Sequence, residues 1–358
     1  MIIYLLLFII LIIFSLISPF LSKKGNRLCS YLVLIVFIFF ISFRGNVGID
    51  TITYKKAFFV IHRLDTLKEL YDYYSILGFE FGFYWLTKGI SLVTSNFNIY
   101  MLIVNLISFT FLFKAIEKKS NNVLLSVCLY FVLFFLNYMN IWRQLIAMNI
   151  ALYSFTFLKT NFKKYIIYLI IASSIHLSVL FLLSLIILKK YQFKRQHLII
   201  VTILVITTYI FADKIFFYIV NNISIFSKFS LYEIGKTSNF IPVIISSTIL
   251  ILALYIYLLN FKDEEMKIYL LCQIICFTCI LCSTQFFYIK RISTLFYIFI
   301  ILWIPLLIKD KINMNRYFII IAFILIQCVL AINTINDPNE KYIPYQIAFK
   351  ADNSYIID

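Results

Sequence analysis

Residues 1–27 read MIIYLLLFIILIIFSLISPFLSKKGNR, so a long apolar run is followed at once by a short basic segment. The run covers residues 2–21, and about 20 apolar residues are needed for an α-helix to cross the hydrocarbon core of a bilayer. No charged side chain precedes the run, and it is longer than the apolar region of a cleaved signal peptide. We therefore expect a membrane span here rather than a removed leader.

The same pattern recurs along the whole chain of 358 residues. Hydrophobic residues make up 63% of it and charged residues only 13%, against about 25% charged residues in soluble proteins. The apolar runs lie near 2–21, 28–43, 79–97, 99–116, 123–140, 141–158, 165–188, 198–220, 241–261, 268–287, 292–308 and 317–335. They predict an all-α, polytopic integral membrane protein with about 10–12 transmembrane helices in a single transmembrane domain, 1–358.

Six short basic segments separate many of these runs. They are SKKGNR (22–27), EKKSNN (117–122), KTNFKK (159–164), KKYQFKRQ (189–196), KDEEMK (262–267) and KDKINMNR (309–316). Because cytoplasmic loops are enriched in Lys and Arg, we place all six on the cytoplasmic side. Most of the net charge of +16 lies in these segments and none of it forms a long basic arm, so we expect no nucleic-acid partner. Part of it could bind an anionic substrate or lipid head groups.

Placing all six segments on one side creates two conflicts in the count of spans. The runs 79–97 and 99–116 cannot both be simple spans, and the run 79–97 contains two glycines and Lys88, so we expect it to re-enter the membrane. The run 165–188 carries ASSIHLS (172–178) at its centre, where we expect a break. Irregular backbone at membrane depth requires cover by protein or a water-filled cavity, so both exceptions predict a cavity that faces outward. The alternative is that one loop departs from the charge bias.

On this topology the external face holds a large loop, 44–78, and the C-terminal tail, 336–358. The corner 136–143 and the short corner FFYIKR (286–291) lie there too. Most of the side chains that could take part in chemistry therefore gather on one side of the membrane.

Four of the seven cysteines lie close together, at Cys272, Cys276, Cys279 and Cys282. Their spacing puts them on one helix face in apolar surroundings, whereas a thiolate zinc site has paired spacing and loops. We interpret them as small residues at a helix–helix contact. The sequence also has no Gly-rich phosphate loop, no HExxH and no GxSxG, so we expect neither a metal nor another cofactor.

The first candidate residue is Arg143, in NYMNIWRQLIAMNIALYSF (137–155). A charge in the membrane is costly, so the side chain either reaches outward to lipid head groups or faces an internal cavity and meets an anion. Amide side chains at Asn137, Asn140, Gln144 and Asn149 favour the cavity, because an interfacial anchor does not need so many polar neighbours.

The second candidate cluster follows the run 28–43 directly. Arg44 comes first, and Asp50 and Tyr54 lie four residues apart, so a helix that starts there brings both to one side. Asp50 is also a natural N-cap for such a helix, which would account for it without any catalytic role.

Three further groups complete the candidates. His176 lies among serines within 172–178, and its imidazole can be either a packing residue or a base. Lys290 and Arg291 lie at the external corner 286–291, where they can anchor the chain or bind an anion. Glu80 opens the suspected re-entrant run.

Five motifs occur along the chain in an order that resembles the pattern of the EpsG family. Members of this family are Wzy-like polymerases of bacterial surface polysaccharides such as O-antigen, capsule or exopolysaccharide. The motifs are RGNVGIDTITY (44–54), FEFGFYWLTKGI (79–90), MNIWRQLIAM (139–148), ASSIHLS (172–178) and KRIS (290–293). Trp142 stands where the family pattern leads us to expect a smaller residue. The resemblance implies transfer of a growing glycan from undecaprenyl diphosphate to the terminal sugar hydroxyl of another lipid-linked repeat unit. It also implies that this transfer occurs on the outer face of the inner membrane.

The residues fit the chemistry that this resemblance implies. Arg143 and Arg291 would bind the diphosphate, with Arg44 assisting, because a guanidinium clamps phosphate oxygens through its planar fork. Such positive charge stabilises the leaving group without a metal. Asp50 or His176 would accept the proton of the acceptor hydroxyl. Tyr54 could stack on sugar rings, and the expected substrate-binding residues are Arg44, Tyr54, Glu80, Asn140, Gln144 and Lys290.

Two other classes remain open at this point. A transporter or flippase for lipid-linked oligosaccharide would also contain intramembrane arginine and broken helices. It would, however, show internal repeats and polar residues through the whole membrane depth. Another membrane transferase, such as a ligase or acyltransferase, could use the same lipid carrier. The expected partners are the undecaprenyl-diphosphate-linked oligosaccharide, a chain-length regulator and a flippase of the same pathway.

Overall fold

The computed structural model describes residues 1–64, 66, 68–69, 72–73, 78–190, 197–212, 214, 218, 222, 240–259, 263–285, 289–308 and 314–348. The chain divides into two compact units. Unit 1 consists of Met1–Leu180 and Ile304–Asp358, and unit 2 of Phe181–Trp303. Each is described by itself, and the prediction of a single transmembrane domain stays a prediction.

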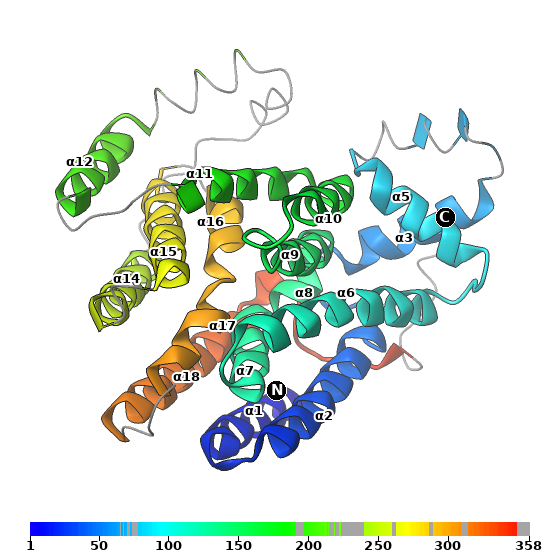
Figure 1. Ribbon diagram of the computed structural model, residues 1–358. Helices are drawn as coiled ribbons and strands as arrows, with labels where there is room; N and C mark the ends of the chain where they lie inside the picture. Colours follow the sequence, from blue (N-terminus) through cyan, green and yellow to red (C-terminus); the bar gives the residue numbers. More distant parts are fainter. Residues whose placement is uncertain are drawn as a thin grey trace. The chain divides into compact units, whose positions relative to one another are not determined.

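Unit 1 is built of helices, and Figure 1 labels its α-helices. They are α1 (Ile2–Ile17), η1 (Ser18–Phe20), α2 (Lys23–Ser42), α3 (Thr51–Arg63), α5 (Phe81–Ser91), α6 (Phe97–Lys119), α7 (Val123–Phe134), α8 (Asn137–Asn140), α9 (Trp142–Phe155), α10 (Phe162–Ile175), η4 (Ile304–Ile308), α18 (Met314–Ile335) and η5 (Pro338–Glu340). Helix α9 contacts α6 and α10, α2 contacts α6 and α7, and α5 contacts α3 and α10.

Unit 2 is helical as well. It holds α11 (Ser184–Lys190), α12 (His197–Ile210), α14 (Ile241–Leu259), α15 (Glu264–Cys282), α16 (Ile289–Tyr297) and α17 (Ile300–Trp303), and the 3₁₀ helix η2 (Leu177–Leu183) leads into it. Helix α15 packs against α14 and α16 and carries the four clustered cysteines, of which Cys272, Cys276 and Cys282 are buried. This placement agrees with the helix–helix contact that their spacing predicts.

Within the described residues, seven helices are long and apolar enough to cross a membrane. The prediction of an all-α polytopic membrane protein is confirmed. The count is lower than the predicted 10–12 because several apolar runs are divided into shorter helices. Helices α9 and α10, for example, have 14 residues each, which is about 21 Å against the ~30 Å of a bilayer core.

Polar residues in four of the basic segments begin the helices that follow them. The side chains of Ser22, Asn122, Asn161 and Asp263 accept hydrogen bonds from backbone N–H groups in the first turns of α2, α7, α10 and α15. Side-chain acceptors at an N-cap satisfy amides that have no partner within the helix. These segments are therefore connections between helices, as their charge predicts, although the side of the membrane on which they lie is still a prediction.

Both exceptional runs are irregular in the structure. Helix α10 ends at Ile175, His176 has an extended backbone (φ −152°, ψ 114°), and η2 continues from Leu177, so the run 165–188 is broken where we expect it. In the run 79–97, α5 has only 11 residues, about 16 Å, which is too short for a simple span. Re-entry of this segment into a membrane and the outward-facing cavity stay predictions.

A buried polar network stabilises the corner between α7 and α9. The Asn149 side chain donates to the Tyr138 hydroxyl (2.6 Å) and to Ser108 Oγ (2.9 Å), and it accepts from the Tyr130 hydroxyl (2.8 Å). All four residues are buried. A fully hydrogen-bonded buried network holds its side chains in one arrangement. It therefore gives the first turn of α9, where Arg143 lies, a rigid base.

Candidate active site around Arg143

Arg143 lies in the first turn of α9 and faces another part of the protein. Its Nη1 atom is 2.5 Å from Oε2 of Glu80, and only 15% of the Arg143 side chain and 19% of the Glu80 side chain are exposed. The guanidinium carbon also lies 4.0 Å from the ring centre of Phe79 and 5.5 Å from that of Phe83. Ion pairing and cation–π contact thus hold the guanidinium inside unit 1. In this arrangement the guanidinium contacts protein groups and does not extend outward to lipid head groups.

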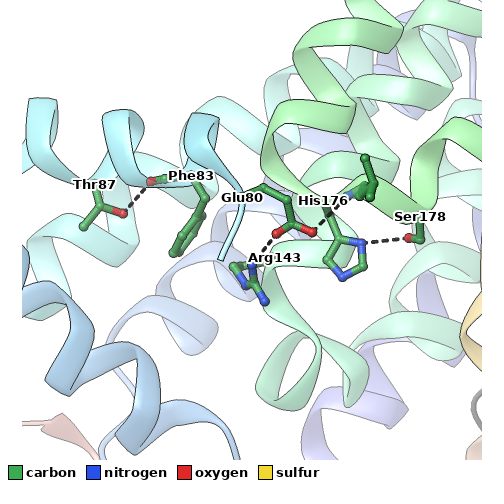
Figure 2. Close-up of polar contacts among 7 residues, drawn as sticks. Glu80, Phe83, Thr87, Arg143, His176 and Ser178 are labelled. Carbon is green, nitrogen blue, oxygen red and sulfur yellow. Dashed lines mark hydrogen bonds and ion pairs between the residues drawn. The ribbon is translucent and has the colours of Figure 1, made fainter. Parts of the chain in front are cut away.

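Glu80 joins three elements of unit 1 (Figure 2). It directly precedes α5, and its backbone oxygen accepts the first helical hydrogen bonds, from the amides of Phe83 and Tyr84. One carboxylate oxygen pairs with Arg143 of α9. The other oxygen accepts from the Leu177 amide, 3.0 Å away, at the break after α10. The carboxylate therefore bridges α9 to the broken segment.

His176 lies at that break, between α10 and η2. Its Nδ1 atom is 2.7 Å from Oγ of Ser178, and Figure 2 shows the imidazole beside Glu80. This partner at one ring nitrogen orients the imidazole, and the Ser178 hydroxyl can either donate to that nitrogen or accept from it. The extended backbone at His176 separates two helical segments, so the amide of Leu177 is available to Glu80.

Close packing of α5 on α10 brings Glu80 to this position. A Cβ atom on Gly82 would lie 2.1 Å from Oγ and 2.8 Å from the backbone oxygen of Ser174 in α10. Only glycine fits at such a distance.

Lys88, one turn before the end of α5, donates to the backbone oxygens of Ile61, His62 and Leu64 at the end of α3. The positive charge is favourable there because helix carbonyls end unpaired at that terminus.

Arg44 is a buried residue that fastens the base of this site. It is 1% exposed, and it donates to the backbone oxygens of Ile41 (2.9 Å) and Tyr138 (3.3 Å) and to Thr51 Oγ1 (3.3 Å). Burial lowers the pKa of Arg44 to about 10, so it is still charged at neutral pH. Its backbone pairs with Ile347 in an isolated antiparallel bridge. These contacts connect Arg44 to the start of α3, to the corner before α9 and to the C-terminal segment at Ile347.

Asp50 and Tyr54 lie at the start of α3. The Asp50 side chain makes no capping hydrogen bond, although its backbone oxygen accepts from the Tyr54 amide (3.0 Å), so capping does not account for this carboxylate. The Tyr54 ring is buried and packs edge-on against Trp142, with ring centres 5.5 Å apart. The pKa of Tyr54 is raised above its ordinary value because the ring is buried, and the Arg143 guanidinium offsets part of this rise. Tyr54 thus forms part of the floor beneath Arg143.

Asn140 connects the corner before α9 to the segment before α3 and to the C-terminal segment. Its Oδ1 atom accepts from the amide of Ile49 (2.9 Å), and its Nδ2 atom donates to Glu340 (2.6 Å) and to the Tyr342 hydroxyl (2.8 Å). Gln144 is buried in α9 next to Arg143. Asn140 therefore holds Ile49, Glu340 and Tyr342 together, and substrate binding by Asn140 and Gln144 stays a prediction.

Lys290 and Arg291 lie in α16 of unit 2 and are exposed. Residues 286–288 of the same predicted corner lie outside the described residues. Because the two units are described separately, a shared site of Arg291 and Arg143 is a prediction.

Trp142 is accommodated without disruption, although we expect a smaller residue at this position. The side chain is fully buried, and its indole N–H donates to Asn105 Oδ1 (2.8 Å). Across the described residues, no group of three His, Cys, Asp or Glu side chains gathers in a way that could hold a metal ion. The site thus consists of a cation, a carboxylate and an imidazole on a rigid helical base.

Comparison with known proteins identified one relationship. A model of the EpsG family matches residues 26–347, which is nearly the full chain. No curated protein and no solved structure matched the chain. The matched region contains Glu80, Arg143 and His176.

Proposed function

The chain belongs to the EpsG family of Wzy-like polysaccharide polymerases, and from this premise we propose a specific reaction for it. The protein is a multi-pass membrane protein of polysaccharide biosynthesis, with a glycosyltransferase-like polymerase activity. In our proposal it transfers a growing glycan from undecaprenyl diphosphate to the terminal sugar hydroxyl of a second lipid-linked repeat unit. The observation that carries the proposal is the cluster of Arg143, Glu80 and His176 at the ends of α9, α5 and α10.

The leaving group needs positive charge, and Arg143 provides it. When the bond between the anomeric carbon and the diphosphate oxygen breaks, the electron pair goes to the diphosphate. A sheltered, preorganised guanidinium stabilises that charge without reorganising. The aromatic rings of Phe79 and Phe83 hold the guanidinium in place. This use of a cation requires no metal ion.

The acceptor hydroxyl must lose a proton as its oxygen attacks the anomeric carbon, and we assign that proton to His176. Its ring is oriented by Ser178 and lies beside the pair of Glu80 and Arg143. Asp50 is the other group in this region that could take the proton. Arg44 and Asn140 act as supporting residues in this scheme.

We place this reaction on the outer face of the bacterial inner membrane. The support for this orientation is the set of six basic segments, which the charge bias assigns to the cytoplasm. The loop that contains Asp50 and the corner that precedes Arg143 connect helices at the ends away from these basic segments. On this topology they therefore fall on the opposite side of the membrane. A chain-length regulator and a flippase of the same pathway are the proposed partners.

A strain that lacks the gene tests this function against transport. Loss of a polymerase should leave single repeat units on the outer surface and remove long chains, because the units still cross the membrane. The measurement is the size and sidedness of the lipid-linked glycans. Units held on the cytoplasmic side would contradict a polymerase and support a flippase.

Gly82→Ala should lower polymer formation about 10–100-fold, because displacement of catalytic groups by about 1 Å can have effects of this size. The new methyl group would force α5 away from Ser174 and carry Phe83, whose ring contacts the Arg143 guanidinium, out of place. The measurement is the amount of long-chain glycan per protein in the membrane. Gly89→Ala on the same helix is the matched control, since nothing lies within 4 Å of its Cβ position, and it should have no effect. Equal activity of both variants would contradict the role of this contact.

A further inference from the structure

We propose that the carboxylate of Glu80 and a phosphate oxygen of the lipid-linked substrate compete for one anion cradle. The cradle consists of the Arg143 guanidinium and the backbone N–H of Leu177. This inference deepens the proposed function and rests on it, because it names the group that binds the diphosphate and the internal anion that opposes it.

The geometry of Glu80 is that of a ligand in a two-point anion site. Arg143 Nη1 contacts one carboxylate oxygen at 2.5 Å, and the Leu177 amide donates to the other at 3.0 Å. A cationic fork combined with a backbone N–H binds carboxylate and phosphate oxygens alike. The donors come from α9 and from the break after α10, whereas the carboxylate comes from α5. The two donors therefore belong to other elements than Glu80, the residue that occupies the site between them.

Arg143 also has a donor that Glu80 does not use. Its Nε atom is buried, and it makes no hydrogen bond within the described part of the chain. A buried donor without a partner is energetically unfavourable. Both carboxylate oxygens of Glu80 are already engaged, whereas a phosphate group offers more oxygens around the same fork. The cradle can therefore donate more hydrogen bonds than the Glu80 carboxylate accepts from it.

Electrostatics make the two anions exclusive. A carboxylate and a diphosphate within a few ångströms repel each other strongly in a sheltered site. A buried guanidinium without a counter-ion is itself unfavourable, and Glu80 balances it. Binding of the diphosphate thus exchanges one anion for another at Arg143 and displaces Glu80 from the cradle.

Pyrophosphate binding to the full-length protein in detergent micelles tests the exchange by isothermal titration calorimetry. Glu80→Gln removes the competing charge and keeps the size of the side chain, so it should bind inorganic pyrophosphate about tenfold more tightly than the wild type. Arg143→Lys should bind it at least tenfold more weakly. Glu117→Gln is the matched control, because Glu117 also pairs with an arginine, Arg27 (2.7 Å), in a more exposed position. Its affinity should not change.

A backbone variant tests the second donor. Leu177→Pro removes the N–H that contacts Glu80, and the extended His176 has the conformation that a residue before proline requires. Proline is also tolerated at the first position of a helix. We expect about tenfold weaker pyrophosphate binding in this variant. Unchanged binding would remove the Leu177 amide from the cradle and overturn the proposed site.

The outcome for Glu80→Gln decides the central point. Equal or weaker pyrophosphate binding than in the wild type would mean that Glu80 only positions Arg143, and it would overturn the competition, as would the absence of binding in every variant. If the predicted order of affinities holds but the purified protein joins no repeat units, the cradle stands and the polymerase proposal fails. If units are joined but Glu80→Gln gains no affinity, the polymerase proposal stands and the competition is refuted.

Discussion

Arg143→Lys should abolish long glycan chains almost as completely as Arg143→Ala. Lysine keeps the positive charge but loses the planar fork that contacts two oxygens at once. The loss of one preorganised donor from a site of developing negative charge typically costs 10²–10³-fold in rate. The measurement is the chain-length distribution of surface glycan in a deletion strain that carries each variant. A normal ladder in either variant would remove Arg143 from the reaction.

A structural effect must be separated from a catalytic one in these variants. Arg143 pairs with Glu80, and removing one partner of a sheltered ion pair can destabilise a protein by about 3–5 kcal/mol. The double variant Glu80→Gln with Arg143→Ala leaves no unpaired carboxylate, so its membrane abundance and thermal unfolding should be close to those of the wild type. Its activity should stay lost. Arg27→Lys, in the exposed pair with Glu117, is the matched control and should retain full activity.

His176→Ala should lower polymerisation by about 10²–10⁴-fold, the usual contribution of a general base. Ser178→Ala should have a smaller effect, since it removes only the 2.7 Å partner that orients the ring. His176→Gln keeps a hydrogen-bonding group of similar length at the break, so it separates loss of the base from loss of the fold. The measurement is the rate of unit addition with purified protein.

Asp50→Asn is the comparison that assigns the proton acceptor. We expect this variant to retain most of its activity, because His176 lies beside the Arg143–Glu80 pair and Asp50 precedes α3. If Asp50→Asn is inactive and His176→Gln is active, the base is Asp50, and the assignment to His176 is wrong.

Local sequence patterns predict the helices well but not their lengths. The apolar runs locate the spans α1, α2, α6 and α18, because apolar length alone determines whether a helix can cross a bilayer. The runs 123–140 and 141–158 are longer than α7 and α9, since the chain bends at the corner that contains α8. The break at His176 is predictable because serines and a histidine interrupt an otherwise apolar run.

The roles of single site residues depend on contacts that no local pattern contains. Glu80 is only one of several candidates in the sequence, because its partners, Arg143 and Leu177, lie 63 and 97 residues further along. Arg44 follows a span, which suggests a role at the substrate. Its contacts with Ile41, Thr51 and Tyr138 show that it supports the fold, and a role at the substrate stays a prediction. The contacts of Glu80 and Arg44 become known only from the tertiary packing.

The most direct test of the central claim uses purified protein in vesicles that contain one defined repeat unit linked to undecaprenyl diphosphate. The measurement follows glycan length and released lipid diphosphate together. We predict a ladder of products and one released lipid diphosphate for each new glycosidic bond, with both absent for Arg143→Ala. Movement of intact units across the bilayer, without a ladder and without released lipid diphosphate, would contradict the account.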